Sequence, residues 1–278
     1  MDAFYKLYSE CFPEDSALCA DVIMKKLISL EKIAAYDGKD LKSALYLVKK
    51  TLRYGNKLAE IRHITALGTF IKDRHKGYAE RLIKEALNDA EVPFLTLYPF
   101  SHAFYEKYGF VAVSYDFDRP DGRGERIDVK KAKLLYDEFC DGLDYAFIRS
   151  EEDFAFFEEV YNADGESFCL VNGGLDSPDG YEPDKFFLTE KKGVMARVAD
   201  LRKALALTDL TTDVRIKVND GFVRKNNLIF TLDKGKTIPC DGFDIEVDAA
   251  EITKAVFGKS EVLKDIFPEK RGYLADRY

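Results

Sequence analysis

The hydrophobic positions of the first third of the chain follow first a helical and then a strand-like spacing. Two stretches with apolar residues at intervals of three and four precede three apolar runs rich in β-branched residues, with turn residues between the runs. We therefore expect two helices followed by an antiparallel meander of three strands. The helices are expected at residues 2–11 and 16–30, and the strands at 32–36, 43–52 and 58–71.

A polar turn separates the third of these strands from an amphipathic helix. Apolar side chains recur at helical spacing over residues 78–87, so the helix begins at about Lys76 or Gly77. The first turn of a helix has backbone N–H groups without internal partners and carries partial positive charge, which attracts anions. Gly77 leaves room for a phosphate, and Arg74 and Lys76 add full charges. Taken alone, residues 74–79 (RHKGYA) fit a phosphate cradle and a solvated, cationic helix start equally well.

Residues 94–110 (FLTLYPFSHAFYEKYGF) form a second candidate unit. An apolar strand-like run ends at Pro99, and Ser101 can cap a short helix that leads to a Tyr-Gly-Phe turn at 108–110. This helix contains Tyr105, whose phenol stays protonated near neutral pH and can donate a proton. A buried aromatic role is the alternative, because the chain contains 16 Tyr and 21 Phe.

The rest of the chain begins with a polar stretch at 116–128, whose charges of both signs, Gly and Pro are typical of a linker. Helical patterns follow at 130–139 and 151–161, and residues 173–185 predict a long, turn-rich loop. The last third is β-rich with caps for two helices. Its expected elements are a strand and an Asp200-capped helix in 194–206, strands at 214–218, 228–232 and 243–247, a hairpin turn at Asp220-Gly221, and an Asp248-capped helix that ends before Gly258.

These patterns together predict an α+β protein in three parts. The first, residues 1–115, has a mixed sheet with flanking helices. The second, residues 116–189, is a linker and a short middle region, and the third, residues 190–278, is a smaller α+β domain.

Composition narrows the class of protein and the kind of site. The five cysteines are scattered without a C-x-x-C pair and the three histidines lack metal-ligand spacing, so we expect reduced core cysteines and no metal. The chain has no run of 18 apolar residues and no signal-peptide pattern at its start, and we expect a cytoplasmic protein without a membrane partner. The net charge of −8 is unevenly distributed, with +2 in residues 1–110 and −10 in residues 111–278. The acidic second part disfavours binding of nucleic acid and favours cationic ligands.

The two candidate units together resemble the signatures of the GCN5-related N-acetyltransferases (GNAT). Residues 74–79 resemble the R/Q-x-x-G-x-G/A loop that binds the pyrophosphate of acetyl coenzyme A (acetyl-CoA), and residues 94–110 resemble the segment where a strand splays from its neighbour to admit the pantetheine arm. The resemblance implies that Tyr105 protonates the departing thiolate. It also implies acetyl-CoA as cosubstrate, without a metal, at Leu67, Gly68, Thr69, Arg74, His75, Lys76, Gly77, Tyr78 and Ala79.

Residues 195–200 (MARVAD), Phe267-Pro268 and an aromatic C-terminus extend the resemblance to the enhanced intracellular survival (Eis) family of acetyltransferases, whose C-terminal domain is sterol-carrier-like. This resemblance implies direct acetyl transfer to a primary amine of a small cationic molecule or a lysine side chain. It also implies that the terminal carboxylate of Tyr278 is the general base. The middle region is much shorter than the second acetyltransferase-like domain of that family, so substrate range and assembly into a homo-oligomer stay open.

Other interpretations of the same residues stay open. Glu60 and His102 are alternative bases, and the last residues can also be a frayed chain end. From another class of protein, the chain can be a lipid or small-molecule binding protein with an inactive, CoA-bound acetyltransferase domain. Residues 190–278 show no unusually apolar stretch of the kind that lines a lipid cavity.

Overall fold

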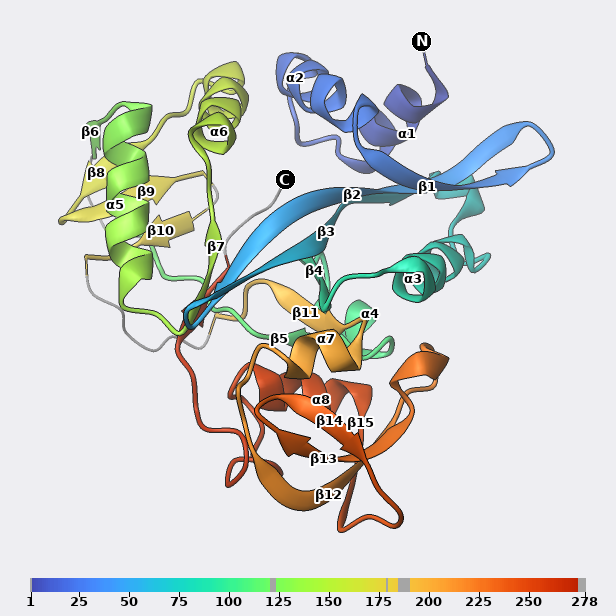
Figure 1. Cartoon of the computed structure of the whole chain (residues 1–278). Coiled ribbons are helices and arrows are strands. Elements are labelled where there is room, and N and C mark those ends of the chain that lie inside the picture. Colours follow the sequence, from blue (N-terminus) through green and yellow to red (C-terminus); the bar gives the residue numbers. More distant parts are fainter. Residues whose placement is uncertain (1, 121–123, 179, 185–190, 275–278) are drawn as a thin grey trace.

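A mixed eight-stranded sheet forms the centre of the molecule (Figure 1). The computed structural model describes residues 2–120, 124–178, 180–184 and 191–274. The strand order is β16-β7-β2-β3-β4-β11-β5, and β1 pairs with β2 off this path. The strands are β1 (Glu31–Asp37), β2 (Asp40–Tyr54), β3 (Lys57–Thr69), β4 (Phe94–Leu97), β5 (Val111–Ala112), β7 (Tyr145–Ile148), β11 (Met195–Val198) and β16 (Gly272–Tyr273).

Helices cover both faces of this sheet, because successive side chains of each strand point to opposite sides. Leu45 and Leu47 of β2 pack with α3 (Tyr78–Asp89), whereas Tyr46 packs in the opposite layer. The opposite layer contains α1 (Ala3–Cys11), α2 (Ala17–Ile28), α5 (Val129–Asp141) and α6 (Glu151–Ala163). The predicted α+β class and the four predicted helices of this layer are confirmed.

The middle region contains more strand than the sequence pattern predicts. The expected loop at 173–185 is wrong, because β9 and β10 pair as an antiparallel hairpin there. They belong to a second sheet of order β10-β9-β8-β6, and β7 joins the central sheet beside β2. Strands this short among Gly, Asp and Pro are formed by pairing with distant residues, which local propensity does not report. The second sheet contains β6 (Glu125–Arg126), β8 (Cys169–Val171), β9 (Gly174–Ser177) and β10 (Gly180–Glu182).

The C-terminal part forms a third sheet of order β14-β13-β12-β15, in which β12 and β15 are parallel. The hairpin expected at Asp220-Gly221 is confirmed, since β12 and β13 pair antiparallel, but its connection is longer than a two-residue turn and contains a 3₁₀ turn (Arg224–Asn226). The N-caps predicted at Asp200 and Asp248 are confirmed, since each side chain accepts a hydrogen bond from the third helical residue. The elements are α7 (Leu201–Leu205), β12 (Thr212–Asn219), β13 (Leu228–Asp233), β14 (Lys236–Pro239), β15 (Ile245–Asp248) and α8 (Ala249–Val256).

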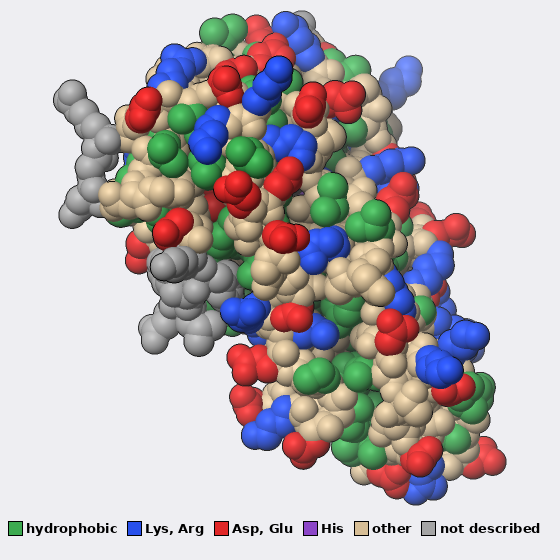
Figure 2. All heavy atoms as spheres, turned by 60° about the vertical axis from the view of Figure 1, so that its left-hand side comes forward, with side chains coloured by type: hydrophobic (Ala, Val, Ile, Leu, Met, Phe, Trp, Pro, Cys, Tyr) green, Lys and Arg blue, Asp and Glu red, His purple; other side chains and the backbone are tan. Residues whose placement is uncertain are grey.

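The surface of the described part of the chain carries mixed charge. Lys and Arg side chains are interspersed with Asp and Glu on the face in Figure 2. Several of these charges form short-range pairs along helices, such as Lys84 with Glu80 and Lys133 with Asp137. No helix within the described ranges is both long enough and apolar enough to span a bilayer.

The central sheet is completed by a strand from the last third of the chain. Strand β11 lies between β4 and β5 and is antiparallel to both, with Met195 opposite Leu97 on one side and Ala112 on the other. Phe94 of β4 consequently shares one hydrophobic cluster with Phe230 and Phe257 of the C-terminal part. The core therefore continues from the central sheet into the third sheet.

Arg197 of β11 connects these parts through a buried ion pair. Its guanidinium is fully buried and donates to the Asp220 carboxylate at 2.6 Å, to the Tyr108 carbonyl at 2.5 Å and to the Val198 carbonyl at 2.7 Å. Asp220 also accepts hydrogen bonds from two backbone N–H groups in its own turn. Burial by itself raises the pKa of the Asp220 carboxyl, but the charge and hydrogen bonds of Arg197 hold this pKa below its ordinary value.

We expect Arg197→Met to lower the free energy of unfolding by about 3 kcal/mol near pH 7, because it leaves Asp220 as a buried, unpaired charge. Since the pKa of Asp220 is lowered in the folded protein, its stabilising contribution is present above about pH 4 and is lost as pH falls through the folded value. The difference in unfolding free energy between variant and wild type should therefore narrow as pH falls below about 4.

Denaturant unfolding at several pH values checks this expectation. The matched control is Arg215→Met, which breaks the exposed pair with Asp244 and should cost much less, because solvent screens exposed pairs. Equal losses of unfolding free energy in the two variants would show that the buried pair stabilises the protein no more than the exposed pair.

Candidate functional site

The candidate site begins where β3 and β4 separate. The two strands pair in parallel only from Arg62 opposite Leu95 to Ile64 opposite Leu97. In this paired stretch His63 and Thr96 are buried, with His63 Nδ1 2.9 Å from Thr96 Oγ1. Beyond it β4 ends while β3 continues to Thr69. The last residues of β3 are therefore not paired with β4, and they face a gap between the two strands.

A β-bulge lies in β3 at the point of separation. Gly68 is opposite Ala44 and Thr65 is opposite Tyr46, so Ala66 and Leu67 together oppose Leu45. Ala66 has a φ of 48°, a left-handed conformation that is uncommon for residues other than glycine. Such a bulge re-aims backbone groups and leaves one residue outside the ladder. Leu67, Gly68 and Thr69, which follow the bulged residue, line a cleft and can contact a ligand there.

The start of α3 provides the second part of the site. Gly77 is the N-cap residue with a φ of 82°, and no side chain accepts a hydrogen bond at this helix end. A Cβ added to Gly77 would have no heavy atom within 4 Å, so the space in front of the helix is open. His75 also has a positive φ, of 62°. The first-turn N–H groups and the partial positive charge of the helix therefore face open space, as an anion site requires.

The charges around this helix start differ from the expectation in one respect. Arg74 is exposed and its Nε donates to the Thr69 carbonyl at 3.3 Å, which holds its guanidinium beside the end of β3. Lys76 instead pairs with the buried Asp73 at 2.7 Å. The pKa of Asp73 is lowered mainly by this hydrogen bond. Lys76 was expected to add a positive charge to the cradle; its ammonium is paired with Asp73, which also lies 3.7 Å from Lys42, and its role towards a ligand stays a prediction.

The bulge and the helix start line one cleft of about 740 Å³. Of the nine residues expected to bind the cofactor, eight line the cleft and Lys76 does not. Sequence reasoning missed the other side of the cleft, which comes from α1, the following loop and the aromatic helix α4 (His102–Glu106). The lining residues that were not predicted are Cys11, Phe12, Glu14, Asp73, Glu80, Phe100, Phe104, Lys107 and Tyr108.

An aromatic wall occupies the β4 side of the cleft. Phe100 is 73% exposed and stacks at 5.0 Å on Phe104, which also lines the cleft. Lys107 lies over the Phe104 ring at 4.4 Å and adds a positive charge that the sequence pattern did not reveal. The density of aromatic residues around Pro99 was the available signal for this wall, but burial in a core explained it equally well.

Tyr105 lies directly behind this wall. It is 3% exposed, and its ring contacts Phe100 at 5.5 Å and Phe104 at 4.9 Å. Burial, and secondarily the neighbouring Tyr108, raise the pKa of Tyr105 well above its ordinary value. The phenol therefore stays protonated across the physiological range and can act as a proton or hydrogen-bond donor. The cleft itself is lined by Tyr108 of the same segment, which is a second phenol near the site.

Cys11 closes the cleft from the α1 side. Its Sγ lies 3.5 Å from the Thr69 carbonyl, and a Cβ on Gly68 would approach this sulfur to 2.9 Å. Gly68 thus permits close packing of α1 on the bulged strand. Burial raises the pKa of the Cys11 thiol, against the opposing effect of Arg74. The thiol is therefore a packing group at neutral pH.

The alternative bases lie away from the described cleft. Glu60 pairs with Arg62 on an exposed part of β3, seven residues before Leu67, which corresponds to about 23 Å along a strand. His102 Nε2 lies 3.2 Å from the Gly193 carbonyl, so in this bond the nitrogen carries a proton and cannot accept another. Neither residue lines the cleft. Tyr278, the other predicted base, lies outside the described residues.

The chain leading to Tyr278 can be followed as far as Leu274. Strand β16 pairs in parallel with β7, and Tyr273 is buried with its hydroxyl 3.0 Å from Glu182. Leu274 is fully buried and its N–H donates to Ser114 Oγ at 2.9 Å. Ser114 follows β5, which runs parallel to β4, so Leu274 lies at the same end of the sheet at which β4 ends.

The geometry of the cleft suits a long ligand with an anionic part and an extended amide arm. The uncapped start of α3 with Arg74 can bind phosphate groups, and the free edge of β3 can pair with an extended chain. The N–H groups at the bulge can bind a carbonyl oxygen, and a phenol lies nearby. A coenzyme A thioester has these groups in this order, so the residues present fit such a molecule.

Comparison with known proteins agrees with this geometry. Residues 1–113 match the model of an acetyltransferase (GNAT) domain family. A search of curated proteins gives no match.

Three solved structures share the fold of nearly the whole chain. A probable N-acyltransferase of unknown function from Enterococcus faecalis has 14% identity and a TM-score of 0.76, covering 99% of this chain and 96% of its own. A GCN5-related N-acetyltransferase from Kribbella flavida has 14% identity and a TM-score of 0.73, with coverage of 100% and 95%. Eis1 from Mycobacterium abscessus has 14% identity and a TM-score of 0.68, with coverage of 92% and 86%.

At this level of identity the structural matches show the fold alone, and the expected likeness to Eis is confirmed at that level. The match to the GNAT family model covers residues 1–113, which include the bulge, the start of α3 and the aromatic helix α4. It assigns this part of the chain to a GNAT domain. The chain therefore carries an N-terminal GNAT acetyltransferase domain within a fold that it shares with Eis1 and with probable N-acyltransferases.

Proposed function

We propose that this protein transfers an acetyl group from acetyl-CoA directly to a primary amine. The observation that carries the proposal is the single cleft that joins the β3 bulge to the uncapped start of α3. The N–H groups at Gly77–Ala79, with Arg74 and Lys107, bind the pyrophosphate. The pantetheine arm lies along β3 from Thr69 to Leu67, and its thioester carbonyl accepts hydrogen bonds at the bulge.

The proposed reaction has two proton transfers around one nucleophilic attack. A base removes a proton from the ammonium form of the acceptor, and the neutral amine attacks the thioester carbon. The tetrahedral intermediate carries its negative charge on the oxygen held at the bulge. The nitrogen then loses its second proton to water, the carbon–sulfur bond breaks, and the Tyr105 hydroxyl donates a hydrogen bond to the departing thiolate. Because the raised pKa of Tyr105 exceeds that of an ordinary thiol, it acts chiefly by hydrogen bonding as the sulfur leaves.

We assign the base to the terminal carboxylate of Tyr278. The route of the chain supports this assignment, because Leu274 is buried at the end of the sheet where β4 ends. Four further residues can extend by at most about 14 Å, which is comparable to the width of three strands.

Replacement of Arg74 by Ala should weaken acetyl-CoA binding about tenfold, because it removes a charge-assisted hydrogen bond at the pyrophosphate. Replacement of Lys76 by Ala should change the affinity little, since its ammonium is held by Asp73. Calorimetric titration with acetyl-CoA measures both. A larger loss of acetyl-CoA affinity in the Lys76 variant than in the Arg74 variant would contradict the proposal that Arg74 binds the pyrophosphate.

Tyr105→Phe should lower kcat about 100-fold while leaving acetyl-CoA binding nearly intact, because only the donor hydroxyl is lost and the ring packing is kept. The matched variant Tyr108→Phe should keep kcat close to the wild-type value. Thiol release under saturating acetyl-CoA measures the two rates. Should the Tyr108 variant be the slower one, the acid is Tyr108 and the present assignment is wrong.

Adding one glycine after Tyr278 should reduce kcat strongly, since it displaces the terminal carboxylate by about 3.5 Å. Tyr278→Ala keeps the carboxylate in place and should retain most of the activity. The same thiol-release measurement compares them, with circular dichroism as a control for folding. Unchanged kcat in the extended variant would exclude the terminal carboxylate as the base.

A further inference from the structure

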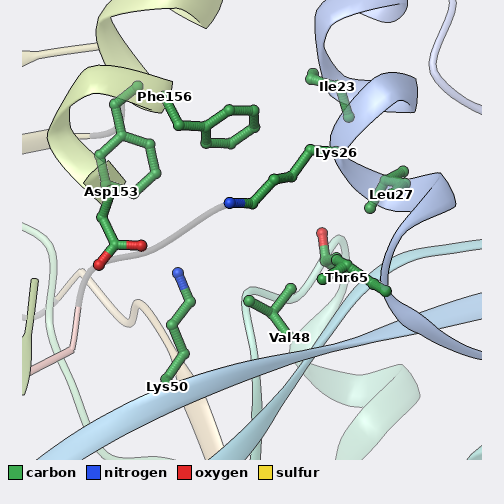
Figure 3. A pocket seen from close by; sticks show the side chains of 10 residues that line it. Ile23, Lys26, Leu27, Val48, Lys50, Thr65, Asp153 and Phe156 are labelled. Carbon is green, nitrogen blue, oxygen red and sulfur yellow. The ribbon is translucent and has the colours of Figure 1, made fainter. Parts of the chain in front are cut away.

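Two hollows lie along β3, and different parts of the chain support them. The smaller one is a pocket of about 30 Å³ between α2, the start of α6 and the strands β2 and β3 (Figure 3). Lys26 and Lys50 point into it, and its described lining residues all fall between positions 23 and 157. The larger one is the cleft at α3 and the aromatic helix, and a loop from the last third of the chain packs behind it.

This loop joins β12 to β13 (residues 220–227) and leaves the core of its own sheet. Phe222 and Val223 pack in the hydrophobic cluster of α3 and the aromatic helix. The inward side chains of the two flanking strands, such as Ile216 and Phe230, belong to the cluster of the third sheet instead. The loop therefore carries apolar side chains from the third sheet to the two helices that border the cleft.

Hydrogen bonds fix the shape of the loop. The Asp220 carboxylate accepts from the N–H groups of Phe222 and Val223 at 2.9 Å each. The side-chain amide of Asn227 accepts from the Asp220 N–H at 2.9 Å and donates to the Asp220 carbonyl at 3.0 Å. Asp and Asn side chains that bond nearby backbone in this way stabilise a turn without regular pairing. Phe222 is thus presented in a defined place.

The Phe222 ring lies against both α3 and the end of the aromatic helix. It contacts the Tyr108 ring edge-on with centroids 5.9 Å apart, and the Lys84 ammonium of α3 lies 5.4 Å from its centre. Lys84 also pairs with Glu80, and both Glu80 and Tyr108 line the cleft. Phe222 therefore contacts one lining residue directly and reaches a second one through Lys84.

Two further contacts hold the same region from the C-terminal part. Lys225 of the loop donates from its Nζ to the carbonyl of Ala90, the C-cap residue of α3, at 2.8 Å. Arg197 binds the Tyr108 carbonyl at 2.5 Å. The backbone of Tyr108 is thus held by Arg197 and its ring by Phe222, while Lys225 fixes the loop to α3.

The Tyr108 ring in turn determines where a positive charge lies. The Lys107 ammonium is 4.9 Å from the centre of this ring and 4.4 Å from the centre of the Phe104 ring. Because aromatic rings attract cations, these two contacts hold the nitrogen beside the cleft that Lys107 lines. A shift of the Tyr108 ring would remove one of them.

We propose that Phe222 is a positioning residue for the coenzyme, which holds the Tyr108 ring so that the Lys107 ammonium can bind the pyrophosphate. This inference rests on the proposed acetyl-CoA site and gives the third sheet a part in it. Phe222 is absent from the described lining of the cleft, so it acts through Tyr108 and not by contact with the ligand.

Phe222→Ala should raise the Kd and the KM for acetyl-CoA about fivefold, the effect expected when one cation–π contact at a ligand site is lost. The kcat at saturating acetyl-CoA should stay within about twofold of the wild-type value, because the groups around Tyr105 are kept. Calorimetry gives Kd, and thiol release gives KM and kcat. A lower kcat with unchanged Kd is the pattern of a merely unstable protein and would overturn the inference.

Other variants separate the ring from general packing. Phe222→Leu keeps most of the apolar volume, covers the case in which the alanine variant fails to fold, and should also weaken binding. Phe222→Tyr keeps the ring and should bind acetyl-CoA like the wild type. The matched control is Phe243→Ala, which removes an exposed ring that lies 4.8 Å from the Lys217 ammonium in the third sheet. Wild-type affinity in a folded leucine variant, or an equal loss in the Phe243 variant, would contradict the proposed role.

A double-mutant cycle tests the route through Lys107. Phe222→Ala should change Kd about fivefold in the wild-type background and by less than about twofold in the Lys107→Met background, because the positioned charge is already gone. Losses of affinity that multiply fully in the double variant would show that the ring does not act through Lys107, and the inference would fail.

Hydrogen exchange of the coenzyme-free protein separates this inference from the proposed function. Amides of residues 102–109 should exchange faster in Phe222→Ala and at the wild-type rate in Phe243→Ala, because the ring contact holds this segment. Unchanged exchange would refute the inference whether or not the protein binds the coenzyme. A wild-type protein that binds no acetyl-CoA would instead overturn the proposed function, and the coenzyme role of Phe222 with it.

Discussion

Insertion of β11 between β4 and β5 is the constraint on which the rest of the structure depends. Without it β4 would be an edge strand, and the turn that carries Tyr105 and Tyr108 would have nothing to hold it. Arg197 on this strand binds the Tyr108 carbonyl and the Asp220 carboxylate together. Gly109, with a φ of 82°, passes so close to this guanidinium that a Cβ would lie 3.1 Å from its Nε. The position of the aromatic helix is thus set by a residue nearly ninety positions further along the chain.

The site lies where the regular pairing of the backbone ends. Strand β3 has lost its parallel neighbour beyond Ile64, the bulge at Ala66 turns N–H groups out of the ladder, and α3 begins at a glycine without a side-chain cap. Unpaired backbone groups cost free energy when they are buried, so they persist where a ligand or water satisfies them. Their alignment along one cleft is the physical basis of the proposed acetyl-CoA site.

The two cavities share β3 and differ in size. The large cleft combines Arg74 and Lys107 with an open helix start, as a long polyanionic ligand requires. The small pocket is lined by Lys26 and Lys50, whose ammonium groups lie over aromatic rings. The bulge at Ala66 lies between Thr65, which lines the small pocket, and Leu67, which lines the large cleft. Leu274, the last described residue, is buried and donates a hydrogen bond from its N–H to Ser114 Oγ.

The sequence by itself determined the local features: the helices around the central sheet, the caps at Asp200 and Asp248, the glycine at the start of α3 and the tyrosine of the aromatic helix. These follow from periodicity and from side chains acting on their own backbone within a few residues. Only the tertiary structure decided that residues 174–182 pair as strands, that Lys76 pairs with Asp73, and that β11 completes the first sheet. It also brought Lys26 and Lys50 together. Strand partners, ion pairs and shared pockets depend on which distant segments meet, and hydrophobic periodicity carries no information about that choice.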